Sequence, residues 1–287
     1  MMQLEGSLSI AEACELARVS RAGFYRAFTD HAPGQAQTEL HDQIQRVALA
    51  NRCYGYRRVT AELRRQGIVV NHKCVLRILR QDNLLSLRRR RFVLTTESRH
   101  GFVRYPNLAG RMAPTAINQL WVADITYIRL REEFIYLAVV LDAYSRRRVP
   151  SGRGWELDET LQASLALKAL DRALADRAIQ PGIVHHSDQG VRYCCPDYVG
   201  RLLDHGFVIS MSRAGTPYDN AKAESFIKTL KAEEVQLKQY RDIEEARQQI
   251  RHFLEEVYNR KRLHSALGYR APAEFEAAAA TAAGGSQ

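Results

Sequence analysis

Two adjacent apolar segments constrain the fold of this chain most strongly. Residues 119–130, QLWVADITYIRL, and 133–145, EFIYLAVVLDAYS, are rich in β-branched and aromatic residues, with few charged residues between them. Runs of this composition, separated by a short polar break, are typical of paired strands. We therefore expect two neighbouring antiparallel strands in this part of the chain.

A third strand is expected at 146–155, RRRVPSGRGW, although Pro150, Gly152 and Gly154 weaken it. Such a strand belongs at the edge of a sheet, where a missing N–H donor costs little. The later elements alternate: a helix capped by Asp158, the strand 182–188, a helix ending at Gly206, the strand 207–210, and helices from Asn220 and Asp242. The order βββαβαβα predicts an α/β core, residues 118–275, with a mixed five-stranded sheet flanked by helices.

The first hundred residues are predicted to form short helices. Ser9 and Glu12 have the spacing of a capping box, and a helix-turn-helix-like pair is expected over 1–30. A second helical segment, 37–87, contains a C-cap at Gly67 and an N-cap at Asn71. The cations on its polar faces are candidates for phosphate contacts: Arg64, Arg65, Lys73, Arg77 and Arg80. The alternative is that these faces are simply solvated.

Charge runs and low complexity define two further segments. Arg88, Arg89, Arg90 and Arg91 are consecutive, and like charges repel, so 88–117 is expected to be an extended basic linker. Its functional interpretation is a segment that follows the DNA backbone and releases counterions on binding. The tail, 276–287, is alanine-rich and is expected to be disordered.

Net charge and cysteine usage restrict the class of protein. The 287 residues carry 42 Lys and Arg against 32 Asp and Glu, a formal charge of +10. This excess favours a polyanionic partner, nucleic acid before membrane, although a basic protein without such a partner fits the charge too. The five cysteines include no C-x-x-C pair, which indicates free thiols in a reducing cytoplasm. No signal peptide or membrane-length apolar run is evident, and His185 and His186 are expected to pack rather than to bind zinc.

Three carboxylates stand out by position. Asp124 alternates with Val122 and Thr126 on one face of a strand, where an unpaired carboxylate is costly. Asp188 lies at the end of the strand 182–188, and 35 residues separate it from Glu224 in the later helix. Taken singly, these acids have ordinary explanations: a satisfied hydrogen bond, a turn residue and a solvent-facing helix residue. Together, converging carboxylates repel one another unless divalent cations bind them, and two Mg²⁺ ions about 3.5–4 Å apart support phosphodiester chemistry.

Two lysines follow Glu224 on the same helix face. Lys228 lies four residues and Lys231 seven residues further on, so both point the same way as Glu224. They are candidates for holding DNA beside the metals. The alternative is helix side-chain pairing, which contributes only about 0.2–0.5 kcal/mol.

These motifs resemble those of the DDE transposases with a retroviral-integrase-like core, and more narrowly the OrfB product of bacterial insertion sequences of family three. The resemblance rests on segments that occur in order between about residues 10 and 275. They are CYGYRRVTAELRRQGIVVNHKCVLRIL, DITY from Asp124, HSDQG around Asp188, the tripeptide Asp219-Asn220-Ala221, ESF from Glu224 with Lys231, and YNRKRLHSALGYRAP at 258–272. The third strand departs from the apolar pattern usual in that group.

The resemblance implies an RNase H-like core in which Asp124, Asp188 and Glu224 form the metal-binding catalytic triad. It implies two Mg²⁺ ions, for which Mn²⁺ can substitute, and cleavage at element ends that exposes a 3′-OH for direct strand transfer. The implied partners are double-stranded DNA (terminal inverted repeats and target), further copies of the chain on DNA, and the upstream OrfA product. Asn220 joins the expected DNA-contacting residues, and the expected location is the nucleoid of a bacterial cytoplasm.

Two other functions remain compatible with the residues. One is a catalytically silent DNA-binding relic or an inhibitor of transposition, which the presence of all three acids argues against. The other is a nuclease that hydrolyses DNA without joining ends.

Overall fold

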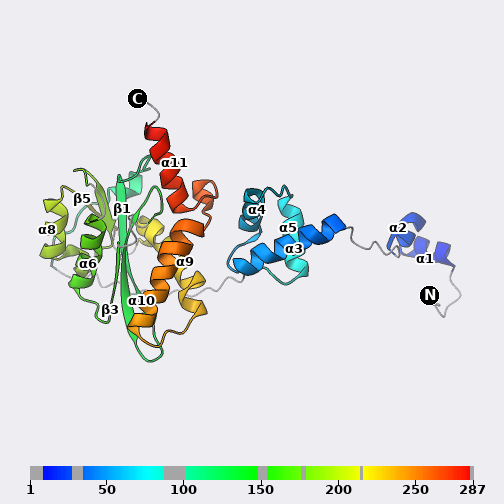
Figure 1. Ribbon diagram of the computed structural model, residues 1–287, viewed down its shortest axis with the longest axis horizontal. Helices are drawn as coiled ribbons and strands as arrows, with labels where there is room; N and C mark the ends of the chain where they lie inside the picture. The colour runs from blue at the N-terminus through cyan, green and yellow to red at the C-terminus, as the bar shows by residue number, and fades with distance from the viewer. Residues whose placement is uncertain are drawn as a thin grey trace.

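A computed structural model describes residues 9–27, 35–86, 101–147, 154–175, 179–213 and 216–284. The core is one five-stranded mixed sheet in the order β3-β2-β1-β4-β5 (Figure 1). Its strands are β1 (Leu120–Arg129), β2 (Phe134–Asp142), β3 (Trp155–Asp158), β4 (Val184–Ser187) and β5 (Val208–Met211). The prediction of a mixed five-stranded α/β core is confirmed.

The two apolar segments form the long central hairpin. β1 pairs antiparallel with β2 from Trp121 opposite Asp142 to Arg129 opposite Phe134. β4 then pairs parallel with β1, and β5 parallel with β4. The parallel half of the sheet therefore has its strand ends on the same side as the end of β1, which is where ligand sites form in α/β sheets.

Helices cover both faces of the sheet (Figure 1). Alternate residues of β1 pack into two separate cores, with Val122 and Ile128 in one and Trp121 and Ala123 in the other. The first core is covered by α9 (Ala221–Glu233), α10 (Ile243–His252) and the π-helix η5 (Phe253–Lys261). The second is covered by α6 (Ala163–Leu174), α7 (Val191–Cys194) and α8 (Pro196–Asp204). Shorter turns of helix are η1 (Ala109–Arg111), η3 (Pro217–Asn220), η4 (Val235–Leu237) and η6 (Ser265–Leu267).

The third strand lies at the sheet edge as predicted, but the predicted range was wrong. β3 starts at Trp155, the last residue of the predicted range. Residues 148–153 of that range lie outside the described part of the chain. The buried pair Trp155 and Leu157 faces Val139 and Leu137 of β2, so apolar alternation places the strand after the glycines. Asp158 accordingly ends β3 and does not cap α6, whose N-cap is Gln162.

Two helical units precede the core. In the first, α1 (Ile10–Leu16) begins with the predicted capping box of Ser9 and Glu12, and α2 (Arg21–Ala27) follows. The second comprises α3 (Gln35–Ala50), α4 (Tyr56–Arg65) and α5 (His72–Gln81). Its fully buried residues are Ile44, Val59, Leu63, Val75 and Leu79. The predicted caps are present, since Gly67 has φ +83° and Asn71 accepts a hydrogen bond from the Lys73 N–H.

The second helical unit packs against the end of the core. Leu263 belongs to its apolar cluster, and the Tyr54 hydroxyl accepts a hydrogen bond from the Leu263 N–H at 2.9 Å. On the core side, Arg262 forms a bidentate pair with Glu233 of α9, whose carboxylate also lies 3.9 Å from Arg58 of α4. An ion pair thus joins α4 to α9, and a hydrogen bond joins Tyr54, just before α4, to the segment after η5.

The predicted linker and tail are partly ordered. This end of the linker is attached to β5 of the core. The Pro106 carbonyl accepts a hydrogen bond from the Met211 N–H, and the Ser210 hydroxyl accepts hydrogen bonds from the Leu108 and Ala109 N–H groups. The prediction of a disordered tail was wrong over 276–284, because α11 (Pro272–Gly284) continues through it. Alanine has the highest helix propensity of all residues, so an alanine-rich segment favours a helix even when its sequence is of low complexity. Among the described helices, none combines the length and apolarity needed to cross a membrane.

Candidate active site

Asp124 and Asp188 come together through strand register. The parallel pairing of β1 with β4 ends with Val122 opposite His186, and each acid lies two residues beyond that pair. Neighbouring strands run about 4.8 Å apart, and residues two apart share a face. The sheet therefore places both carboxylates side by side where β4 ends.

The turn after β4 fixes the orientation of Asp188. Its Oδ1 accepts a hydrogen bond from the Gly190 N–H at 2.9 Å, and Gly190 caps α7. A Cβ at position 190 would lie 2.9 Å from the same Oδ1, whereas the backbone angle φ of −68° suits any residue. Glycine thus leaves room for the carboxylate in this orientation, and a larger residue would have to displace it; the backbone itself is not left-handed.

Glu224 is brought to the same edge by the start of α9. Asn220, the N-cap residue, is only 7% exposed, and its Nδ2 donates a hydrogen bond to the Ala123 carbonyl at 3.0 Å. This bond ties the helix to β1 at the residue before Asp124. Asn220 was predicted to contact DNA, and that contact stays a prediction; in the structure its buried side chain holds α9 against β1.

The electrostatics of Asp124 show that the three acids interact. Its Oδ1 accepts a hydrogen bond from the Ile125 N–H, which favours the charged form. Desolvation and then the negative charges of Asp188 and Glu224 outweigh that bond and raise the pKa of Asp124 to about 8. Excess negative charge at this edge is the condition under which a bound cation stabilises a site.

Two lysines of α9 flank the acids as predicted. The Lys228 ammonium lies 3.5 Å from Glu224, and that of Lys231 lies 4.1 Å from the centre of the Tyr127 ring. Burial lowers the pKa of Lys231, while the charge of Asp124 acts in the opposite direction. Lys231 is therefore a half-buried cation held between an aromatic face and the acidic edge.

The donor set suits a hard divalent cation. Mg²⁺ is commonly held by one or two carboxylates, with water and phosphate supplying the remaining oxygens. Asp124 and Asp188 at adjacent strand positions meet that requirement. Across the residues that the structure describes, no three His, Cys, Asp or Glu side chains lie close enough to enclose a metal, and Glu224 is paired with Lys228.

The two histidines before Asp188 are fully buried. His185 Nε2 lies 3.0 Å from the Tyr198 hydroxyl, and burial lowers its pKa to about 3. His186 lies between the hydroxyls of Ser210 and Ser212, at 2.8 and 3.1 Å, and burial lowers its pKa to about 4. Both rings are neutral packing groups that support β4, and all five cysteines are free thiols.

The remaining predicted DNA contacts lie elsewhere. Arg64, Lys73 and Arg77 are exposed on α4 and α5, at a distance in the chain from the acidic edge. Arg65, by contrast, is paired with Glu274 of α11 at 2.8 Å. Arg88, Arg89, Arg90 and Arg91 lie outside the described residues.

Sequence reasoning missed three contacts that support this edge. Asn220, predicted as a DNA contact, bonds the Ala123 carbonyl, and Gly190, predicted as a turn residue, also donates a hydrogen bond to Asp188. A third contact is the clamp of Asp219 by Arg213, through a bidentate side-chain pair that lowers the pKa of Asp219 to about 2. No single-residue signal separates such supporting contacts from ordinary turn or helix-cap residues.

The five-stranded mixed sheet and the family comparison define a polynucleotidyl transferase with an integrase core. The integrase core domain family matches residues 114–217, and a second integrase core domain family matches 205–272. A helix-turn-helix-like domain family matches residues 35–92.

Curated relatives are similar over almost the whole chain. An uncharacterized 31 kDa protein of insertion element IS600 from Shigella sonnei is 38% identical over 91% of this chain and 96% of its own length. The transposase InsF of insertion sequence IS3A from Escherichia coli K12 is 34% identical, covering 95% of each chain. The transposase of IS904 from Lactococcus lactis is 37% identical over 78% of this chain and 87% of its own length. The chain belongs to the family of insertion-sequence transposases related to IS3.

Solved structures are more distant. The catalytic core of HTLV-2 integrase in complex with magnesium covers 56% of this chain and 98% of its own, with 12% identity and a TM-score of 0.41. The catalytic domain of the Mos1 mariner transposase covers 48% of this chain and 71% of its own, with 13% identity and a TM-score of 0.38.

Proposed function

We propose that this transposase cuts DNA at the ends of its insertion sequence and joins the exposed 3′-OH to target DNA, using Asp124, Asp188 and Glu224 as the catalytic residues. The observation that carries the proposal is the strand register, which brings Asp124 and Asp188 to neighbouring positions where β4 ends. Desolvation, and then the charges of Asp188 and Glu224, raise the pKa of Asp124, and a bound cation would offset that repulsion.

The acids divide the work by position. Asp124 and Asp188, at neighbouring strand ends, would hold one Mg²⁺ together, and Glu224 would leave Lys228 to complete a second site with Asp124. Two Mg²⁺ ions held by these residues, with Mn²⁺ able to substitute, would supply the positive charge that phosphodiester chemistry needs at the attacking and leaving oxygens. Asn220 and Gly190 keep the three side chains oriented.

DNA is held by cations around this edge. Lys231 and Lys228 lie beside the acids, and Arg64, Lys73 and Arg77 offer phosphate contacts on the helical unit. The net charge of +10 supports a duplex partner that includes terminal inverted repeats and target DNA. Work on two element ends calls for more than one copy of the chain, and the OrfA product is proposed as a further partner.

A strand-transfer assay tests this function. Purified protein is incubated with labelled element-end DNA, target plasmid and Mg²⁺, and joined products are resolved from nicked ones. We expect joined products from the wild type and none from Asp188→Asn, since the amide can still accept the Gly190 hydrogen bond but cannot supply the charge. Asp158→Asn, at the far edge of the sheet, is the matched control.

The same assay separates the alternatives. Cleavage without joining would identify a nuclease. If the wild type and Asp188→Asn both bind DNA but neither cleaves it, with or without Mg²⁺, the protein is a silent DNA-binding protein.

A further inference from the structure

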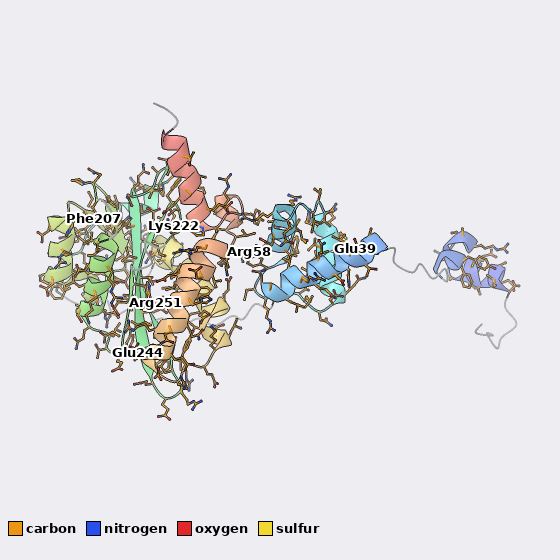
Figure 2. The ribbon with its side chains drawn as sticks, viewed as in Figure 1. Glu39, Arg58, Phe207, Lys222, Glu244 and Arg251 are labelled. Carbon is orange, nitrogen blue, oxygen red and sulfur yellow. The ribbon has the colours of Figure 1, made fainter. Side chains whose placement is uncertain are left out.

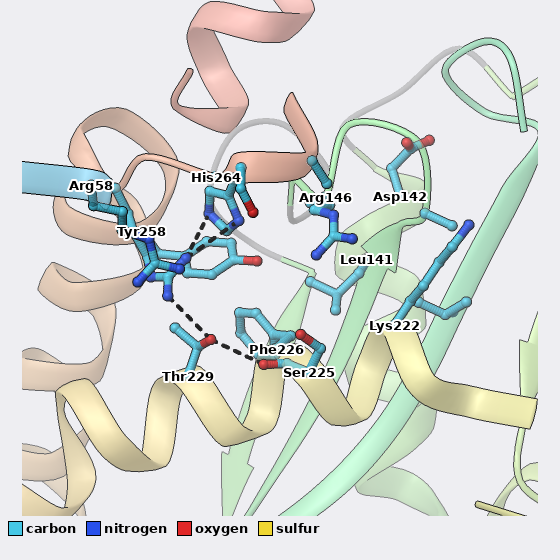
Figure 3. A pocket seen from close by; sticks show the side chains of 15 residues that line it. Arg58, Leu141, Asp142, Arg146, Lys222, Ser225, Phe226, Thr229, Tyr258 and His264 are labelled. Atoms are coloured by element: carbon cyan, nitrogen blue, oxygen red, sulfur yellow. Dashed lines mark hydrogen bonds between the residues drawn. The ribbon is translucent and has the colours of Figure 1, made fainter. Parts of the chain in front are cut away.

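A second charged site lies behind α9, where the helical unit meets the core. A cavity of about 160 Å³ opens between α4, α9, the end of β2 and the segment after η5 (Figure 3). Figure 2 shows Arg58 on the side of the helical unit and Lys222 on the core. Its lining includes four cations and a histidine: Arg58, Arg146, Lys222, Arg262 and His264.

Positive charge in this cavity is only partly compensated. Glu233 pairs with Arg262 at 2.7 Å and lies 3.9 Å from Arg58, so one carboxylate serves two guanidiniums. Asp142 also lines the cavity, but its oxygens accept hydrogen bonds from the N–H groups of Asn118, Tyr144 and Ser145. Four cations therefore face two carboxylates, one of which is already held by backbone donors.

The ionisation of the lining groups reflects this imbalance. Burial, followed by the charge of Arg262, lowers the pKa of Arg58. Burial, followed by the charge of Arg146, lowers the pKa of Lys222. Burial and the neighbouring Arg262, Arg146 and Arg58 likewise depress the pKa of His264, which keeps the ring neutral. An anion in the cavity would relieve all of these repulsions at once.

Arg146 is placed in the cavity by an uncommon backbone. Its φ is +55°, a left-handed conformation that costs a non-glycine residue free energy and that is concentrated at functional sites. Figure 3 shows its guanidinium between His264 and Lys222, above Ser225 of α9. The hydroxyls of Ser225 and Thr229 add hydrogen-bonding groups to the lining.

We propose that this cavity binds a phosphodiester group of the DNA backbone, held by Arg58 of the helical unit together with Arg146 and Lys222 of the core. The volume is below the roughly 300–1,000 Å³ of pockets that enclose a drug-sized ligand, so it suits one phosphate group better than a whole nucleotide. Planar guanidiniums match phosphate geometry. Because Arg58 and Lys222 lie on different units, a phosphate bound here fixes the helical unit against the core. The choice of DNA as the source of the phosphate rests on the proposed function.

Salt-dependent DNA binding tests the proposal. Binding of the full-length protein to a linear duplex of mixed sequence is measured by fluorescence anisotropy over a range of chloride concentrations, in EDTA so that catalysis plays no part. Each lost phosphate contact lowers the slope of log K against log salt by about 0.9. We expect that reduction for Lys222→Gln and for Arg146→Gln, with Lys222→Arg retaining the wild-type slope. Arg251→Gln, an equal charge change on the exposed face of α10, is the control and should leave the slope unchanged.

A second arm distinguishes DNA from free phosphate. Melting temperatures are measured with inorganic phosphate and with chloride at equal ionic strength. Phosphate that stabilises the wild type but not Lys222→Gln, while the DNA slopes stay equal, would overturn the DNA assignment. Slopes for Lys222→Gln and Arg146→Gln that match Arg251→Gln, without a phosphate effect, would overturn the anion site altogether. Wild-type protein that binds no DNA would instead contradict the proposed function.

Discussion

The two sides of α9 carry opposite unbalanced charges. On one side, desolvation and then the charges of Asp188 and Glu224 raise the pKa of Asp124. On the other side, burial and then the charge of Arg146 lower the pKa of Lys222, while the charge of Asp142 acts in the opposite direction. In each case the protein disfavours the charges that it has gathered, and a ligand of opposite sign restores the balance. If both proposals hold, a single helix separates a cation site from an anion site, as expected for an enzyme that brings metal ions to a polyanion.

Neutralising the acid on α9 should have the largest effect on the acidic side. Glu224→Gln keeps the shape of the side chain but removes the charge, and we expect cleavage to fall about 10³-fold or more, equivalent to about 4 kcal/mol of transition-state stabilisation. The circular dichroism spectrum should stay unchanged. Glu244→Gln, on the exposed side of α10, is the control, and a collapsed spectrum for Glu224→Gln would make Glu224 a structural residue.

The acidic side should also bind metal in a pH-dependent manner. Because the pKa of Asp124 is raised to about 8, this carboxyl holds a proton at pH 6 to 7, and a metal must displace it. We expect the apparent Mg²⁺ affinity to rise about tenfold per pH unit between pH 6 and 8 and to level off above pH 8. Calorimetric titration measures it. An affinity independent of pH would show that Asp124 takes no part.

Removing the repulsion should stabilise the metal-free protein. The folded-state pKa of Asp124 lies above its unfolded value of 3.8, so this group destabilises the fold progressively as pH rises from about 4 to 8. With allowance for solvent screening, we expect Asp124→Asn to be about 2 kcal/mol more stable at pH 8, or about 4–8 °C in Tm. Thermal unfolding in EDTA measures this gain, which should vanish near pH 4. A variant that melts below the wild type at pH 8 would refute the account of strained acids.

A smaller effect should come from crowding Asp188. Gly190→Ala places a Cβ 2.9 Å from the Asp188 Oδ1 without straining the backbone, so the carboxylate must turn. We expect about tenfold weaker metal binding, as for loss of an outer contact to a ligand. Gly200→Ala, where nothing lies within 4 Å of the added atom, is the matched control. Equal metal affinity of both variants would separate Gly190 from the site.

The smallest expected change concerns the cation beside the acids. Lys231→Ala should lower the salt slope of DNA binding by about 0.9, since one phosphate contact is lost. Lys238→Ala is the control, because the Lys238 ammonium is paired with Glu234 and the variant measures the effect of losing one positive charge away from the acids. An unchanged slope for Lys231→Ala would mean that its contact with Tyr127 is structural only.

Local patterns in the sequence were enough to name the three acids, whose catalytic role stays a prediction. Asp124 is a carboxylate on an apolar strand face, Asp188 ends a strand, and the spacing to Glu224 matched a family motif, so all three could be named in advance. The central hairpin and the caps at Ser9, Asn71 and Asp242 followed from alternation and hydrogen-bonding chemistry.

The basic side could not be predicted in the same way. Arg58, Arg146, Lys222 and Arg262 come from four separate segments, each of which carries an ordinary surface cation when viewed alone. The burial of Asn220 depends on a contact with β1, almost a hundred residues away in the chain. The predicted range of β3 was wrong because the strand is set by apolar pairing with β2 and lies after the proline and glycines. The predicted disorder of the tail was wrong because its alanines favour a helix.

The most direct test of the central claim is the position of the bound metal. Crystals of the protein grown with Mn²⁺ and element-end DNA give an anomalous difference map that locates each ion. We expect a peak between the carboxylates of Asp124 and Asp188, with Glu224 turned away from Lys228 toward a second peak. Mn²⁺ bound to the DNA or elsewhere on the protein, with no peak at Asp124 and Asp188, would contradict it.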